Sequence, residues 1–183
     1  HNMKENEYVD QAVFFEEKGN FLHKQAFAFS GLDELTGYHE EYGQMPLVPY
    51  MLFVLWKIFG ESLFIGRILM ISFFMGAVLL TYFIVKKLTN NDYLSLLSSG
   101  LMSIMTLGIF FGRNIQPEPP ALFFSLLALL FYFKWLDEDH SKNIFLATLF
   151  LGIAGLFKYT FLIFAIPIVA VFPFKKFFIE LAQ

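Results

Sequence analysis

Three ionisable residues stand out because they interrupt long apolar runs. Arg113 and Glu118 lie in the Pro-rich break RNIQPEPP (residues 113–120), and Lys158 separates two later apolar stretches. Arginine and lysine bind phosphate or pyrophosphate leaving groups, and a nearby carboxylate can accept a proton from an attacking hydroxyl. For each residue the alternative is an ordinary helix end, where cationic side chains reach the polar interface.

The N-terminal part of the chain, residues 1–45, is polar and acidic. Apolar spacing predicts a helix over residues 5–18, and the three glycines of the stretch 30–43 predict a loop. In that loop, His39-Glu40-Glu41 is a candidate site for a divalent metal, because imidazole and carboxylate groups suit such an ion. A solvated acidic loop is the alternative, and no other cofactor is indicated.

Composition predicts that the elements carrying these residues lie in lipid. The chain of 183 residues is 57% hydrophobic and 16% charged, and it contains 26 phenylalanines. Soluble domains average about 45–50% apolar and about 25% charged residues. With no cysteine, disulfides and thiolate metal sites are excluded. The net charge of −3 gives no argument for nucleic-acid binding.

The predicted architecture is all-α: a polytopic membrane protein with about five spans and amphipathic interfacial helices in an outer-face N-terminal region. Residues 46–60 are too short for a bilayer core and predict an interfacial helix, with a short buried span as the alternative. Lys158 is expected between two short spans, because a mid-bilayer lysine in one long tilted helix would cost roughly 3 kcal/mol. The predicted spans are 63–85, 93–112, 120–136, 144–157 and 160–174.

Basic residues predict the orientation of these spans. Alternating spans put most lysines on one side, which is expected to be cytoplasmic: Lys86, Lys87, Lys134, Lys142, Lys175 and Lys176. Arg67, Arg113 and Lys158 then share the outer side with the N-terminal region. The expected divisions are 1–61 (outer acidic and juxtamembrane region), 62–176 (transmembrane bundle) and 177–183 (tail).

The order of these features resembles the GT-C membrane glycosyltransferases, in particular the protein mannosyltransferase and aminoarabinose transferase group. Their acidic first-loop motif is similar to the spacing of Glu5, Tyr8, Ala12 and Gly19. Further along, the matching features are Met45-Pro46-Leu47, the apolar run to Gly60, Gly66-Arg67, Arg113 with Pro117-Glu118, and Lys158 before a Pro-containing span. The motif's aspartate, the family's expected base, corresponds to Lys4.

The resemblance implies transfer of a sugar from a polyprenyl-phosphate lipid to a protein or lipid acceptor at the outer membrane face. It implies Glu5 or Asp10 as catalytic residues, and Arg113, Glu118, Lys158 and Arg67 as substrate-binding residues. The expected location is the cytoplasmic membrane of a bacterium or archaeon, with the N-terminal region outside. The expected partners are the lipid bilayer, the polyprenyl-phosphate sugar donor, and either partner proteins or the remainder of a longer chain.

Two other functions remain open. Lys4 at the motif's aspartate position, together with the short chain, suggests a non-catalytic membrane subunit or a degenerate relative that packs with partner proteins. Lys158 and Glu118 as intramembrane charges are also typical of a transporter, although the spans show no repeat.

Overall fold

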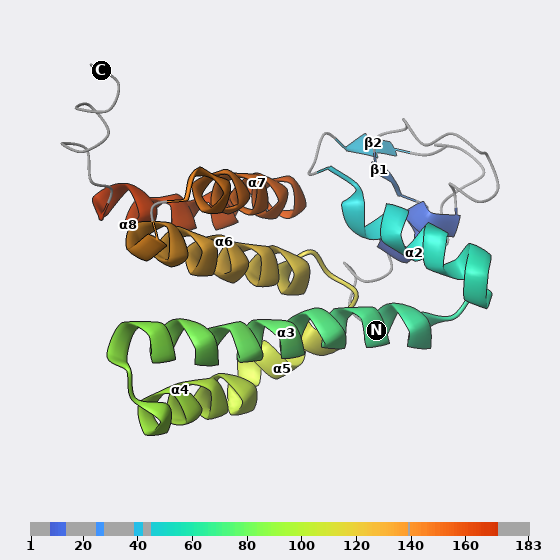
Figure 1. Ribbon diagram of the computed structural model, residues 1–183. Helices are drawn as coiled ribbons and strands as arrows, with labels where there is room; N and C mark the ends of the chain where they lie inside the picture. The colour runs from blue at the N-terminus through green and yellow to red at the C-terminus, as the bar shows by residue number, and fades with distance from the viewer. Residues whose placement is uncertain (1–7, 14–24, 28–38, 42–44, 139, 172–183) are drawn as a thin grey trace, which may run out of the picture.

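The computed structural model describes residues 8–13, 25–27, 39–41, 45–138 and 140–171, and these are mainly helical, as predicted (Figure 1). Residues 8–13 form a helical turn, and two short strands pair with each other. The named elements are β1 (Gln25–Phe27), β2 (His39–Glu41), α2 (Leu47–Phe59), α3 (Leu63–Thr89), α4 (Asp92–Ile104), α5 (Thr106–Arg113), α6 (Glu118–Glu138), α7 (Ser141–Phe157), the 3₁₀ helix η1 (Tyr159–Phe164) and α8 (Ala165–Ala170).

The strands β1 and β2 form an antiparallel ribbon in which Ala26 faces Glu40. The strand β2 lies inside the stretch predicted as loop, and its pairing partner lies in a segment for which no strand was expected. The pairing joins two three-residue segments that are distant in sequence, so no local periodicity reveals it. Of the helix predicted over 5–18, the described residues 8–13 are helical.

The helix predicted over residues 46–60 is observed as α2, and it packs against the bundle on one side. Val48, Leu52 and Trp56 are at most 5% exposed. The indole Nε1 of Trp56 donates a hydrogen bond to the carbonyl of Ser62 at 3.1 Å, which ties α2 to the start of α3. Gly60 ends α2 with φ +84°, a conformation that glycine adopts without a Cβ clash.

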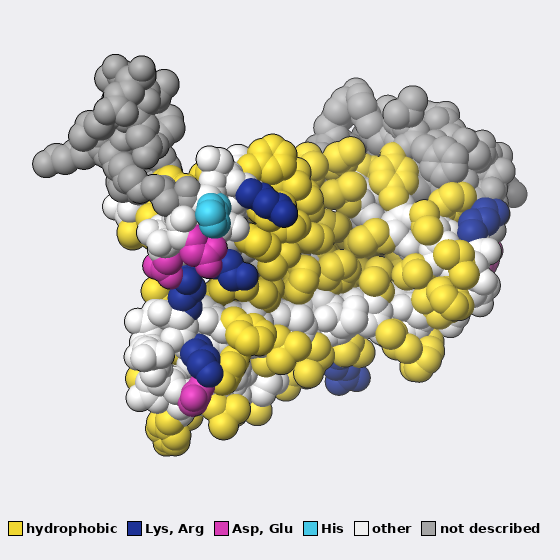
Figure 2. All heavy atoms as spheres, viewed as in Figure 1, with side chains coloured by type: hydrophobic (Ala, Val, Ile, Leu, Met, Phe, Trp, Pro, Cys, Tyr) yellow, Lys and Arg dark blue, Asp and Glu magenta, His cyan; other side chains and the backbone are white. Residues whose placement is uncertain are grey.

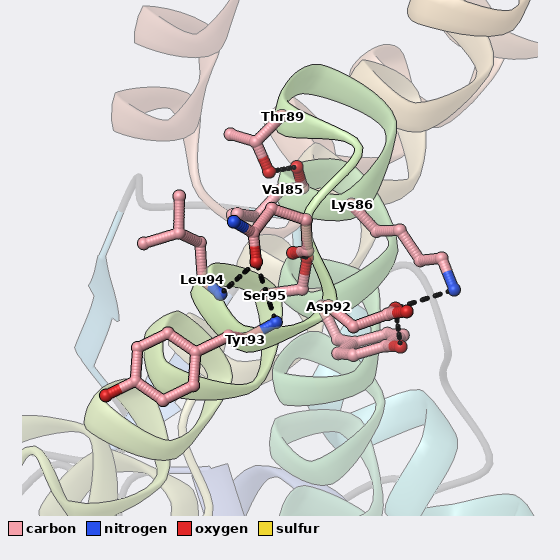
Figure 3. Close-up of polar contacts among 9 residues, drawn as sticks. Val85, Lys86, Thr89, Asp92, Tyr93, Leu94 and Ser95 are labelled. Atoms are coloured by element: carbon pink, nitrogen blue, oxygen red, sulfur yellow. Dashed lines mark hydrogen bonds and ion pairs between the residues drawn. The ribbon is translucent and has the colours of Figure 1, made fainter.

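The helix α3 is the longest element, and its C-terminal turn shows how the sequence reverses direction. Asn90 adopts the left-handed conformation with φ 51°. The Asn91 side chain accepts hydrogen bonds from the backbone amides of Tyr93 and Leu94, at 2.9 and 3.2 Å respectively. Asn91 thereby caps α4. An ion pair of 2.7 Å between Lys86 and Asp92 closes the same turn (Figure 3).

The span predicted over 93–112 is wrong as a single helix, because it is divided at Met105 into α4 and α5. Met105 is extended, with φ −62° and ψ 121°. After the break, Gly108 and Gly112 lie so close to α3 that an added Cβ would be 2.7 and 3.0 Å from the Phe74 ring. The break therefore lets α5 approach α3 more closely than a continuous helix would allow.

The remaining helices run back and forth beside α3 (Figure 1). The helix α6 packs against both α3 and α7, and stacked rings join α6 to α7 through Phe124, Phe150 and Phe157. The helix α7 ends at Phe157, directly before Lys158. The chain then returns along α7 as η1 and α8, so Lys158 lies between two apolar segments, as predicted.

Burial in the bundle follows the pattern of a membrane protein. Ala77, Ser95, Ser125 and Ala128 are completely buried between helices. Leu52, Met70 and Tyr132 are completely buried as well. Many other large apolar side chains point outward; among them, Phe64, Leu79, Leu96 and Phe145 are 59–70% exposed. Small residues inside and large apolar residues outside are what lipid as a solvent favours. In Figure 2 a broad hydrophobic surface extends from a charged end of the bundle.

Two of the described helices, α3 and α6, are long and apolar enough to cross a membrane. The helices α2 and α7 and the stretch 159–170 are apolar but shorter. The five predicted spans therefore correspond to two full-length helices and to shorter or divided segments.

Candidate functional site

The centre of the candidate site is an ion pair between Glu118 and Lys158. Lys158 Nζ lies 2.6 Å from Glu118 Oε1, although the residues are 40 positions apart. Both side chains are largely buried, with 17% of Glu118 and 23% of Lys158 exposed. Glu118 begins α6, and Lys158 is the extended residue that ends α7. Both were predicted as substrate-binding residues, and the fold brings them together.

The second carboxylate oxygen of Glu118 has no hydrogen-bond partner in the described part of the chain. This atom, Oε2, is buried. The residues that follow, Pro119 and Pro120, have no backbone N–H, and the amide of Ala121 donates to the Pro117 carbonyl at 3.0 Å. Because the first turn of α6 is depleted of donors, Glu118 retains one oxygen that can accept a hydrogen bond from a ligand.

An apolar cavity of about 230 Å³ lies against Glu118. It is bounded by α5, the start of α6, η1 and the break between α4 and α5. Within the described part of the chain, Glu118 is the one charged residue that lines it. The other lining residues are Phe74, Met102, Met105, Gly108, Phe111, Gly112, Pro119, Leu122 and Phe161.

A separate cleft of about 440 Å³ contains the two predicted arginines. Arg67 lies in the first turns of α3, and Arg113 is the last residue of α5. Asn114 also lines the cleft and donates from its side-chain amide to the Phe110 carbonyl at 3.0 Å. The remaining lining residues are Phe64, Ile68, Ile71 and Phe110. Two guanidinium groups beside an apolar wall suit an anionic amphiphile.

The structure thus divides the predicted substrate-binding residues into two sets. Gly112 lines the cavity beside Glu118, whereas the next residue, Arg113, lines the arginine cleft. Successive residues of a helix point about 100° apart, so the two sites lie on different faces of α5. Both adjoin the C-terminal end of that helix.

The predicted catalytic residues lie in the N-terminal segment. Glu5 is outside the described residues. Asp10 lies in the helical turn 8–13 and is half-buried, and burial raises its pKa above the ordinary value. The neighbouring Ala12 is completely buried in the same apolar cluster as Ile115 and Phe157. This packing joins the N-terminal turn to the segments that precede Glu118 and Lys158 in sequence.

Sequence reasoning missed two buried amides near these segments. Gln11 and Gln116 are 1% and 2% exposed, respectively. Both side-chain polar atoms of Gln11, and Oε1 of Gln116, are buried without a hydrogen-bond partner in the described residues. Gln116 lies inside the predicted polar break, which was a usable signal. Nothing in the sequence around Gln11 distinguishes it from an exposed residue.

The described residues contain no group of three or more histidine, cysteine, aspartate or glutamate side chains placed to hold a metal ion. The candidate metal residues His39, Glu40 and Glu41 form β2, and their side chains lie outside the described part of the structure.

Comparison with known proteins gives one family match. The model of the family described as dolichyl-phosphate-mannose-protein mannosyltransferase matches residues 44–178. No curated protein and no solved structure gives a match. The matched region contains Arg67, Arg113, Glu118 and Lys158, and it excludes residues 8–13.

Proposed function

The chain belongs to the dolichyl-phosphate-mannose-protein mannosyltransferase family of GT-C membrane glycosyltransferases, and from this premise we propose that it moves a sugar from a polyprenyl-phosphate donor to a protein or lipid acceptor. The proposed location of the reaction is the outer face of the membrane. Most of the predicted cytoplasmic lysines in the described residues, among them Lys86, Lys87 and Lys142, lie at or beyond the ends of α3 and α6, whereas the arginine cleft and the ion pair adjoin the opposite ends of these helices.

The observation that carries this proposal is the arginine cleft. A polyprenyl-phosphate sugar has an anionic phosphate between a sugar and an apolar chain. Arg67 and Arg113 supply cationic groups for the phosphate, and Phe64, Ile68 and Phe110 supply an apolar surface for the adjoining isoprene units. Cationic groups also stabilise the negative charge that develops on the departing phosphate.

The ion pair supplies the second part of the proposed site. In this proposal Glu118, which is paired with Lys158, contacts the sugar or the acceptor hydroxyl through Oε2. Asp10 and Glu5 remain the proposed catalytic carboxylates of the N-terminal segment. Burial that raises the pKa of Asp10 makes it a stronger proton acceptor.

Release of polyprenyl phosphate from labelled dolichyl-phosphate-mannose tests the proposal. The purified chain in lipid nanodiscs should release it when a membrane extract provides acceptors. Arg113→Gln should weaken donor binding about 10- to 100-fold, because a hydrogen bond to a charged group contributes roughly 1.5–3 kcal/mol. Lys142→Gln is the matched control, since Lys142 is exposed at the start of α7 and lines neither site.

A chain that neither binds nor cleaves the donor would refute the proposed function. Binding without cleavage, unchanged by any acceptor, would instead favour the non-catalytic subunit. The sequence feature behind that second function is Lys4, which the resemblance aligns with the family's motif aspartate.

A further inference from the structure

The cavity beside Glu118 has a chemistry that restricts what can enter it. Resting on the proposed function, we infer that the sugar acceptor is a membrane-dissolved lipid alcohol, whose hydroxyl reaches Glu118 through this cavity. The donor phosphate occupies the arginine cleft on the other face of α5. The inference therefore decides between the protein and lipid acceptors that the family membership leaves open.

The lining of the cavity excludes a peptide. Among the described residues that line it, every one except Glu118 is apolar or glycine. A serine or threonine in a peptide carries its backbone N–H and C=O groups with it, and such groups buried without partners each cost roughly 1–3 kcal/mol. A lipid alcohol brings a single polar group on an apolar chain. That one donor matches Glu118 Oε2, the buried acceptor without a partner among the described residues that line this cavity.

The entrance of the cavity lies at the side of the bundle. Met105 lines the cavity and is also 54% exposed on the outer surface, at the break between α4 and α5. Its neighbour Ile104 is 68% exposed, so the surface around the break is apolar. At about 230 Å³ the cavity is smaller than the roughly 300–1,000 Å³ of typical ligand pockets. It therefore fits the head region of a lipid alcohol whose chain remains in the bilayer.

Two glycines and an aromatic ring shape the inner wall. A Cβ at Gly108 would lie 2.7 Å from Phe74, so the ring is packed directly against the α5 backbone. Leu122 of α6 and Phe161 of η1 also line the cavity. Met105 and Glu118 line the same cavity, so we expect an entering chain to pass from Met105 to Glu118.

The reaction step balances with the groups present. The acceptor oxygen forms a bond to C1 of the sugar, and the bond between C1 and the phosphate oxygen breaks. Polyprenyl phosphate leaves with the electron pair of that bond, and the hydroxyl proton passes to Glu118 Oε2. The ion pair with Lys158 holds the carboxylate in position before the transfer. Lys158 is thus a positioning residue, whereas Glu118 contacts the acceptor and takes the base role for which Asp10 and Glu5 were the predicted candidates.

Photolabelling tests occupancy independently of turnover. The probe is a long-chain alcohol with a diazirine in its chain, added to the protein in nanodiscs and mapped by mass spectrometry. Label is expected at Met102, Met105 or Phe161, with competition by octadecanol at least fivefold stronger than by octadecane. Leu122→Trp should reduce labelling, whereas Leu149→Trp, on the exposed face of α7, should not. Equal competition by dolichyl phosphate would overturn the inference, because the cavity would then hold the donor chain.

Acceptor choice tests the chemistry. With labelled dolichyl-phosphate-mannose, octadecanol should become glycosylated, whereas a serine- and threonine-containing peptide should not. Glu118→Gln should retain photolabelling within about threefold but lose transfer by roughly 100-fold or more, the range of general-base catalysis. Glycosylation of the peptide alone would refute the inference and leave the proposed function intact. Absence of donor cleavage with every acceptor would refute the proposed function, while photolabelling would still decide which lipid occupies the cavity.

Discussion

Adding one methyl group at Gly66 should measure how tightly α2 and the Pro-rich break are packed on α3. The Cβ of Gly66→Ala would lie 2.7 Å from Leu52 Cδ2 and 2.8 Å from Ile115 Cδ1. Both neighbours are completely buried, so neither can rotate into open space. Overpacking of this kind costs about 1–3 kcal/mol. Replacing a helical glycine by alanine recovers about 0.5–1 kcal/mol.

The matched control is Gly152→Ala, because an added Cβ at Gly152 has no atom within 4 Å. This control should gain the same helical contribution without the overpacking. The two variants should therefore differ in stability by about 2 kcal/mol, near the middle of the overpacking range. In a chain of this size, 1 kcal/mol shifts the melting temperature by roughly 2–4 °C. Gly66→Ala should thus melt about 4–8 °C below Gly152→Ala.

Thermal unfolding in detergent, followed by tryptophan fluorescence, provides the assay. Trp56 is buried beside the substitution and Trp135 lies in α6, so the signal reports on both parts of the bundle. Equal melting temperatures for the two variants would refute the reasoning. They would mean that α2 and the segment around Ile115 can move away from α3 at little cost, and that the arginine cleft has no fixed wall.

Three further substitutions test the local physics of the fold. Asn91→Ala should destabilise the chain by about 1 kcal/mol in the same melting assay, because α4 loses its side-chain cap. Asp10→Asn should stabilise the chain increasingly as the pH rises past 3.8, the ordinary pKa, because the folded state holds the Asp10 proton more tightly than the unfolded state. If the melting temperatures of the variant and the unsubstituted chain did not diverge as the pH rises, this reasoning would be contradicted. Lys158→Gln should cost about 1–3 kcal/mol by leaving Glu118 without its cation, and adding Glu118→Gln should restore part of that loss in a double-mutant cycle.

The ion pair between Glu118 and Lys158 was within reach of sequence reasoning. Each residue interrupts an apolar run, and alternating spans place both interruptions on one side of the membrane. The cost of an intramembrane charge then favours pairing of the two residues. The direct contact of 2.6 Å depends only on α6 and α7 being antiparallel neighbours, which a short connection ensures.

The division of the site into a cavity and a cleft was beyond sequence reasoning. It depends on the rotation of α5 about its own axis, and this is set by contacts of Gly108 and Gly112 with Phe74. The helix breaks at Met105, and methionine is neither glycine nor proline, so local propensity predicts a continuous helix there. Tertiary packing overrides that propensity. The burial of Gln11 has the same origin, because it follows from packing of a short turn on distant segments.

The charges of the two sites explain why the proposed reaction would use both. The Glu118–Lys158 pair is internally compensated, so it offers little net attraction to a phosphate. Arg67 and Arg113 bring two guanidinium groups to one cleft, and two cationic groups together attract an anionic phosphate more strongly than the ion pair does. Exclusion of the phosphate from the cavity keeps Glu118 available for a neutral hydroxyl. If Lys158 were present without Glu118, its uncompensated charge would attract the phosphate to the cavity. Donor and acceptor would then compete for the same position.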